Sequence, residues 1–440
     1  MRLVSLASPS PARAAFSGPH VTPAGALRFA AALLVVANLG AVPTFSLGNR
    51  SAPLFLNDVL VFFALFVGGV AIARARSLQL DKVALAALAF AGIGALSAVG
   101  SMPRYGLTVF EVLASLAYLA RWLMYFGIYL VILNCVKERD VSGIWKALEG
   151  TMLVFAGFGI FQAAFLPDFG QMIYPESKLY LEIDPQGHRL MSTILEPNIA
   201  AAMILTVLLV YIAQLAMGAT VARWKPALLL VALVLTISRS GALAFLVGVF
   251  TIFAVRGLGR KMVRFLGVML VALIASLPPL LRFASTYQKL GISDVSAAAR
   301  FIVWQRSIAT FLDNPWFGIG FNTYGFVQER NGIERYGSAT YSAEGGLLFI
   351  AVMTGIVGLA VYGVMLWLQY RRCRSVWRNR LATPDERGFC LGAAAATVAI
   401  LVHSVFVNTL LTTWVMEPLW ILWGITFLVA RTVRQRHALT

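Results

Sequence analysis

Four arginines lie in segments that the hydropathy pattern places on the outer side of a membrane, where basic residues are uncommon. Arg189 lies in GHRLMSTILEPN, Arg239 lies in LTISRSGALAF, and Arg300 and Arg306 lie in AAARFIVWQRS. A guanidinium is always charged and donates paired hydrogen bonds to phosphate oxygens. These arginines therefore suit the binding of a pyrophosphate or another anion. Snorkelling to lipid headgroups, or pairing with nearby carboxylates, would be a purely structural role.

Glu344 is the acidic residue best placed for acid–base chemistry. It lies in YSAEGGLLFIAVMTG, at the start of an apolar run and before two glycines, which let other groups approach closely. A carboxylate at a partly desolvated membrane edge gains the proton affinity that a general base needs. A structural alternative is that this charge meets a helix N-terminus or neutralises an arginine.

Three further residues are candidates for substrate binding: His188, Asn198 and Trp304. His188 and His403 are the candidate titrating imidazoles, and neither has a partner at metal-ligand spacing. The sequence contains no recognisable Ser/His/Asp arrangement and no nucleophile elbow. It therefore predicts neither a metal site nor a serine nucleophile.

Charges inside apolar runs form a second group. Glu111 and Arg121 lie in one run, and Asp58 and Glu417 lie near the outer ends of two others. A charge at membrane depth is costly unless it is paired. We expect these four side chains to pair across helices and hold the bundle together.

The composition sets the environment of all these residues. The chain has 440 residues, of which 59% are hydrophobic and 12% are charged, and its net charge is +17. A soluble domain cannot bury so much apolar surface. Lys and Arg gather in short loops between apolar runs, which is the orientation signal of membrane proteins and does not indicate nucleic-acid binding. The three cysteines suggest no disulfide framework.

Twelve spans fit the apolar runs, which predicts an all-α, polytopic transmembrane bundle. With the amino terminus in the cytoplasm, the basic loops and the carboxyl terminus then also lie inside. This count requires a tight outer turn at residues 238–241, between two short helices. The predicted spans are 25–42, 54–73, 83–101, 109–134, 147–166, 198–217, 224–238, 240–255, 262–281, 343–369, 389–407 and 413–430.

The chain is accordingly divided into five segments: a cytoplasmic tail, 1–23; spans one to nine, 24–281, with an outer loop at 167–197; a large outer loop, 282–342; spans ten to twelve, 343–430; and a second tail, 431–440.

The large outer loop contains a predicted amphipathic helix, which would lie on the membrane or cover a cavity. Its sequence, AAARFIVWQRSIATFL, places one apolar stripe at helical spacing, and DNPWFGIGFNTYG follows as a helix-breaking turn. The stripe consists of Phe301, Trp304, Ile308 and Phe311, and the turn contains Pro315, Gly318 and Gly320.

Four stretches, in this order, resemble the superfamily of O-antigen ligases and O-antigen or exopolysaccharide polymerases. They are HRLMSTILEPNIAA, LTISRSGALAFLVG, RFIVWQRSIATFLDNPWFGIGFNTYGF and EGGLLFIAVMTGIVGL. The large outer loop between spans nine and ten is also typical of that superfamily. The stretches cover about the second half of the chain, and the first half is similar in topology alone.

The resemblance implies a metal-independent, inverting glycosyltransferase that uses no cofactor, at the periplasmic face of the bacterial inner membrane. It implies that Arg189 and Arg239 bind the pyrophosphate of an undecaprenyl-pyrophosphate-linked glycan. Arg300 and Trp304 match the loop pattern of the superfamily. Ligases carry their proposed base, a histidine, at the position that Glu344 occupies here, whereas exopolysaccharide-type polymerases are often acidic there.

The sequence therefore favours a polymerase of lipid-linked repeat units in exopolysaccharide or O-antigen synthesis, with Glu344, Arg239 and Arg189 as the catalytic residues. Three alternatives stay open: an O-antigen ligase with lipid A–core as acceptor, a flippase for the same lipid-linked glycan, and a structural partner in an export complex. The expected partners are the lipid-linked glycan, the bilayer, and a chain-length regulator or export complex.

Overall fold

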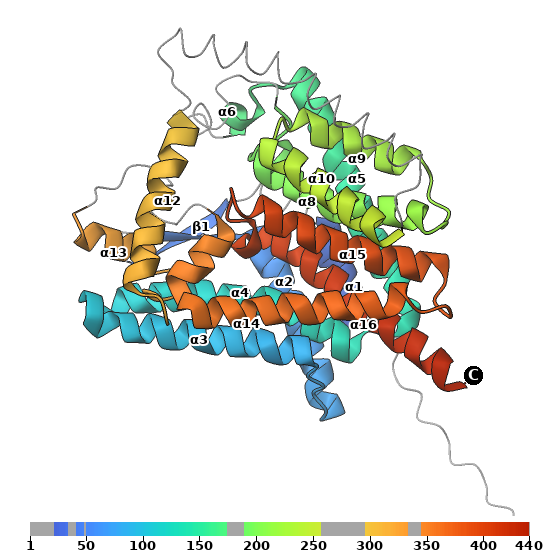
Figure 1. Cartoon of the computed structure of the whole chain (residues 1–440), viewed down its shortest axis with the longest axis horizontal. Helices are drawn as coiled ribbons and strands as arrows, with labels where there is room; N and C mark the ends of the chain where they lie inside the picture. The colour runs from blue at the N-terminus through green and yellow to red at the C-terminus, as the bar shows by residue number, and fades with distance from the viewer. Residues whose placement is uncertain are drawn as a thin grey trace, which may run out of the picture.

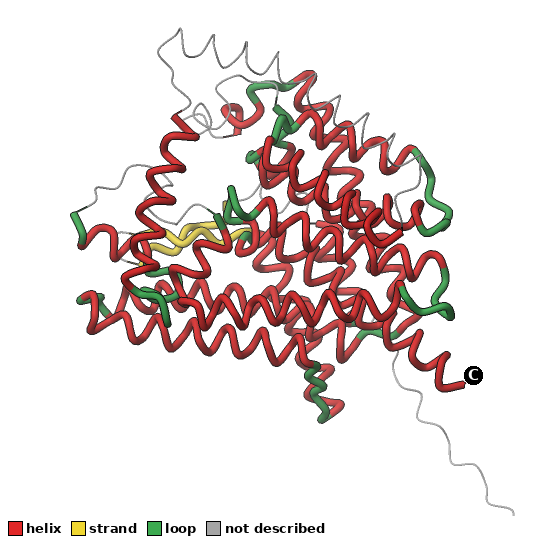
Figure 2. Tube along the Cα trace, in the orientation of Figure 1, coloured by secondary structure: helices red, strands yellow, loops and turns green. Residues whose placement is uncertain are grey.

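The computed structural model of the chain describes residues 22–33, 41–47, 50–173, 189–256, 295–332 and 345–439. These residues form a helical bundle with one antiparallel pair of strands (Figure 2). The first half contains α1 (Pro23–Leu33), β1 (Ala41–Leu47), β2 (Arg50–Phe55), α2 (Leu56–Ala75), α3 (Lys82–Tyr105), α4 (Val109–Cys135), η1 (Glu138–Asp140), α5 (Val141–Phe165) and α6 (Phe169–Ile173). The second half contains η2 (Ser192–Ile194), α8 (Pro197–Ala216), α9 (Trp224–Leu235), α10 (Arg239–Arg256), α12 (Val295–Asp313), α13 (Tyr324–Arg330), α14 (Gly346–Trp377), α15 (Pro384–His403), η4 (Thr409–Leu411) and α16 (Thr413–Leu439).

Within the described ranges, nine helical segments are long and apolar enough to cross a membrane. They are α2, α3, α4, α5 together with η1, α8, α10, α14, α15 and α16. The predicted polytopic helical bundle is therefore confirmed. The predicted span 262–281 lies outside the described residues, and α9 has only 12 residues. The predicted sidedness of the loops and the segment boundaries stay predictions.

The first predicted span, 25–42, is wrong at its end. Residues 41–47 form β1, which pairs antiparallel with β2. Pro43 explains part of the error, because the residue before a proline is disfavoured in the helical region, so Val42 is extended and not helical. The strand register is irregular between Val42 and Phe45, on either side of this proline.

Helix α8 is the centre of the second half of the bundle, and most of its residues are buried. Glycines let its neighbours approach closely. A Cβ on Gly241 of α10 would lie 2.7 Å from the Ala201 Cβ, and one on Gly392 of α15 would lie 2.9 Å from the Leu209 oxygen. Small residues at such contacts are typical of membrane bundles, where close packing replaces the hydrophobic effect.

Helix α14 runs beside α3 (Figure 1) and is broken at Gly355. The turn that follows α12 fills the break. Ile319 N donates to Val352 O (2.9 Å) and Gly320 N donates to Met353 O (3.1 Å), while Ile356 N donates to Pro315 O (2.7 Å). The backbone groups freed by the break are therefore satisfied by a segment of the predicted outer loop.

The predicted pairing of the intramembrane charges is confirmed for Arg121, Asp58 and Glu111, whereas Glu417 is bound by an uncharged side chain. Arg121 of α4 forms an ion pair with Asp58 of α2, with N and O atoms 3.1 Å apart. Glu111 pairs with Arg330 of α13 at 2.7 Å, and Glu417 accepts a 2.7 Å hydrogen bond from the side chain of Asn57.

We expect Asp58→Asn to lower the stability of the purified protein by about 3 kcal/mol, because it leaves the mostly buried Arg121 without its carboxylate. Thermal unfolding in detergent measures the effect. The matched control is Glu138→Gln, which breaks the more exposed 3.6 Å pair with Arg431 and is expected to cost less than about 1 kcal/mol. Equal losses in the two variants would contradict this prediction.

Candidate functional site

The turn between α9 and α10 carries Arg239. Helix α9 ends at Leu235 and α10 begins at Arg239, so the predicted break between two helices is confirmed, but it lies at 236–238 and not at 238–241. The side chain of Ser238 caps the new helix, because its Oγ accepts a 3.1 Å hydrogen bond from Gly241 N. Arg239 is exposed at the positive end of the α10 dipole.

Arg189 is anchored to the same turn. Its Nε donates a 3.0 Å hydrogen bond to the carbonyl oxygen of Thr236, and Leu190 N donates to Leu235 O at 2.9 Å. Two arginines that are 50 positions apart in the sequence are therefore attached to one short turn. The two arginines that the resemblance assigns to the pyrophosphate thus share one local structure.

Asn198, in the first turn of α8, connects this region to a carboxylate. Its Nδ2 donates to Glu196 Oε1 (2.8 Å), and its Oδ1 accepts from Ser238 Oγ (2.8 Å). Glu196 itself caps α8 through the backbone N–H of Ile199. Asn198 was predicted to bind substrate, and in the structure it joins the start of α8 to the start of α10.

This series of hydrogen-bonded polar side chains continues into α15. Ser240 Oγ lies 3.2 Å from Ser238 Oγ and 3.1 Å from Nε2 of His403, the last residue of α15. The other ring nitrogen, Nδ1, lies 3.4 Å from Thr409 Oγ1. The His403 side chain is fully buried. One network of side chains therefore joins the ends of α8, α10 and α15 beside Arg239.

The start of α14 lies against the same end of α15. Gly346 N donates a 2.5 Å hydrogen bond to Ser404 O. Gly345 adopts φ +96° and lies against Val405 O. A Cβ at Gly345 would lie 2.5 Å from that oxygen, so only glycine fits here. Glu344 and His188 lie outside the described residues.

Helix α12 confirms the predicted helix in the outer loop, but its packed face differs from the predicted stripe. Ser307 and Val303 are buried, whereas Ile308 is 47% exposed. The polar Ser307 faces inward because its hydroxyl reaches Tyr324 OH at 3.2 Å. Burial in turn raises the pKa of Tyr324.

Three predicted site residues lie on α12. The Trp304 ring is half-buried, with its centroid 6.1 Å from that of Phe406, close after His403 in the chain. Arg306 is exposed, and the side chain of Arg300 lies outside the description. Trp304 thus packs α12 against the segment that follows His403, while Arg306 is exposed.

This arrangement is suited to an anion. Helices α8 and α10 both begin here, as does α14, and helix N-termini carry partial positive charge. Arg189 and Arg239 add full charges, and amide, hydroxyl and imidazole groups lie beside them. Among the described residues, no three His, Cys, Asp or Glu side chains are grouped as metal ligands would be.

One feature of this network could not be found from the sequence, whereas another had a visible signal. The contact between Ser240 and His403 joins residues 163 positions apart, and no local spacing indicates it. The two serines beside Arg239 were a visible signal, because a hydroxyl at a helix start is a common cap.

Comparison with known proteins gives one finding for this region. Residues 227–363 match the family model described as O-antigen ligase, a segment that includes α9, α10, α12, α13 and the start of α14. The chain matches no curated protein. The resemblance seen in the sequence is thereby confirmed over this segment: the chain is a multi-pass membrane protein whose residues 227–363 match the O-antigen ligase model.

Proposed function

We propose that this protein is a polymerase of undecaprenyl-pyrophosphate-linked oligosaccharide repeat units, acting at the periplasmic face of a bacterial inner membrane. One observation carries the proposal: Arg189 is hydrogen-bonded to the turn that precedes Arg239. Arg239 lies inside the segment that matches the O-antigen ligase model, and Arg189 lies before that segment in the chain. Two guanidiniums at one turn, Arg239 next to it in the chain and Arg189 hydrogen-bonded to it, beside helix N-termini, suit a leaving pyrophosphate.

The proposed step is a direct displacement at the anomeric carbon of the growing chain. A hydroxyl at the non-reducing end of a new repeat unit forms the new glycosidic bond as the bond to the pyrophosphate oxygen breaks. Glu344 takes the hydroxyl proton, and undecaprenyl pyrophosphate leaves with the electron pair. Arg189 and Arg239 stabilise its developing charge. Configuration at the anomeric carbon is inverted.

Supporting side chains have separate tasks in this proposal. Ser238 and Asn198 hold the turn and the start of α8 in register, and His403 holds Ser240. Trp304, packed on Phe406, covers the site from α12 and contacts sugar or lipid, with Arg300 and Arg306 as additional contacts to the anion. His188 contacts the substrate beside Arg189.

The glycan left on undecaprenyl pyrophosphate in cells that lack the protein tests the proposal. Single repeat units, with polymer lost, are expected of a polymerase. Long polymer stranded on the carrier would instead identify an O-antigen ligase, the second candidate, which the description of the matching family model favours. Repeat units trapped on the cytoplasmic leaflet would identify a flippase, and an unchanged glycan would overturn all three.

Glu344→Gln is expected to abolish polymer formation while the protein still inserts, because the amide cannot accept the hydroxyl proton. Polymer is measured at matched protein levels in the membrane. The control is Glu329→Gln, an acidic change near the end of α13 that is expected to leave polymer at the wild-type level. Wild-type polymer length and yield in Glu344→Gln would remove this carboxylate from the mechanism.

A further inference from the structure

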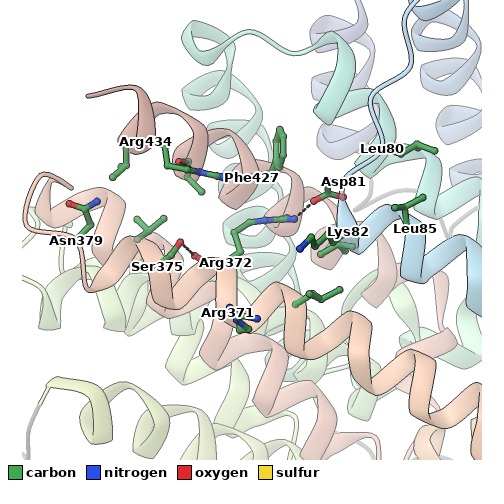
Figure 3. Close-up of a pocket in the computed structure, with 15 residues that line it drawn as sticks. Leu80, Asp81, Lys82, Leu85, Arg371, Arg372, Ser375, Asn379, Phe427 and Arg434 are labelled. Atoms are coloured by element: carbon green, nitrogen blue, oxygen red, sulfur yellow. Dashed lines mark hydrogen bonds and ion pairs between the residues drawn. The ribbon is translucent and has the colours of Figure 1, made fainter. Parts of the chain in front are cut away.

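A cavity lies at the other end of α14, far along the helix from the polar network. Its volume is about 620 Å³, within the range of small-molecule sites. It lies between the start of α3, the end of α14 and the end of α16 (Figure 3). The sequence predicts that this end of the bundle faces the cytoplasm, so the cavity belongs to the opposite membrane surface from Arg239.

The cavity carries a net positive charge. Four basic side chains and one acidic side chain line it, which leaves a net charge of +3. The acidic residue, Asp81, is neutralised by an ion pair with Arg372, which also donates a 2.8 Å hydrogen bond to Tyr129 OH. Among the described residues, no ion pair involves the three remaining cations, Lys82, Arg371 and Arg434.

The three remaining cations are exposed at the mouth of the cavity, whereas its wall is apolar. The guanidinium carbon of Arg371 lies 4.6 Å from the centroid of the exposed Trp367 ring. Arginine and tryptophan gathered at a helix end are typical of the membrane–water boundary. The apolar lining consists of Leu80, Val83, Leu85, Leu368, Val376, Phe427, Ala430 and Val433.

We propose that this cavity binds one anionic phospholipid from the cytoplasmic leaflet. The lipid phosphate lies among Lys82, Arg371 and Arg434, and the first part of an acyl chain lies along Leu368 and Phe427. Basic pockets between transmembrane helices on this side suit anionic headgroups, and the apolar wall favours a lipid over a free phosphate. The buried Asp81–Arg372 pair fixes α3 against α14 and so shapes the site. This binding is independent of glycosyl transfer.

Native mass spectrometry of the delipidated, full-length protein tests the proposal. Phosphatidylglycerol and phosphatidylcholine with the same acyl chains are titrated separately. The test variant is Lys82→Gln/Arg371→Gln/Arg434→Gln. The matched control is Arg374→Gln/Arg378→Gln/Arg380→Gln, which removes three exposed cations of the same region that do not line the cavity. Ser375→Trp fills the cavity without removing a charge.

We expect the wild type and the control to retain one phosphatidylglycerol in preference to phosphatidylcholine. Each lost cation lowers the affinity about fivefold, so the test variant binds about a hundredfold more weakly. Ser375→Trp also loses the bound lipid. Equal retention of the two lipids, or equal losses in the two triple variants, would overturn the proposal. Displacement of the lipid by millimolar inorganic phosphate would show that the site binds a free anion instead.

Discussion

Replacing Arg239 by alanine is expected to lower polymer formation by about a hundredfold or more. The charge of this side chain lies at the N-terminus of α10, on the turn to which Arg189 is anchored. Removing a preorganised donor from a developing anion costs about 3–4 kcal/mol in the transition state, whereas the ground state loses less. The loss should therefore appear mainly in kcat. Polymer formed from purified lipid-linked repeat units by reconstituted protein is the measurement.

Two further variants separate charge from geometry. Arg239→Lys keeps the charge but cannot make two parallel hydrogen bonds, so we expect an intermediate rate. Arg256→Ala removes an exposed arginine from the other end of α10 and should leave the rate unchanged. Wild-type activity in Arg239→Ala, or an equal loss in Arg256→Ala, would contradict a role for Arg239 at the leaving group.

Gly355→Ala is expected to prevent stable folding of the second half of the bundle. Gly355 adopts φ 67° and ψ −170°, a region that is essentially restricted to glycine. A Cβ there would also overlap the carbonyl of Trp316 in the turn that fills the break in α14. The turn would have to withdraw and give up its hydrogen bonds to α14, including the 2.7 Å bond from Ile356 N to Pro315 O. The combined cost exceeds about 4 kcal/mol.

The measurement is the yield and thermal stability of the protein after extraction in detergent. Gly363→Ala is the matched control, because Gly363 lies in the same helix and a Cβ there would meet no atom within 4 Å. It should be neutral or stabilise the protein by up to about 1 kcal/mol. Hydrogen exchange that is faster at the amide of Ile356 alone shows local loss of the turn, whereas faster exchange throughout the helices shows global unfolding. Unchanged exchange in Gly355→Ala would contradict the prediction.

The helices of the bundle were predictable because apolar runs of membrane length dominate the sequence. The break between α9 and α10 was also predictable, since the basic loops require an even number of crossings. The hairpin of β1 and β2 was missed because the apolar run beyond α1 was predicted to be helical, although Pro43 and the Gly48–Asn49 pair between the strands were turn signals. The break in α14 at Gly355 was missed because TGIVGL lies inside an unbroken apolar run.

The residues of the candidate site were likewise predictable only in part. Charged residues out of place in a membrane protein pointed to Arg189 and Arg239, and to the paired Arg121, because charge at membrane depth needs a partner or a ligand. His403 and Ser240 were not assigned together, because their contact depends on how α15 packs against α8 and α10. The orientation of α12 was likewise set by tertiary packing, through the hydrogen bond between Ser307 and Tyr324.

The 12 residues of α9 have a consequence for the surrounding lipid. A helix of that length rises about 18 Å, whereas the hydrocarbon core of a bilayer is about 30 Å thick. In the proposed function, where this turn faces the periplasm, the outer leaflet thins beside Arg239, or water and headgroups sink to meet it. The long isoprenoid tail of a carrier lipid can then stay dissolved in the acyl chains while its charged end reaches the arginines. Under that proposal, the protein would lower the membrane surface to its lipid-linked substrate and would not need to extract it from the membrane.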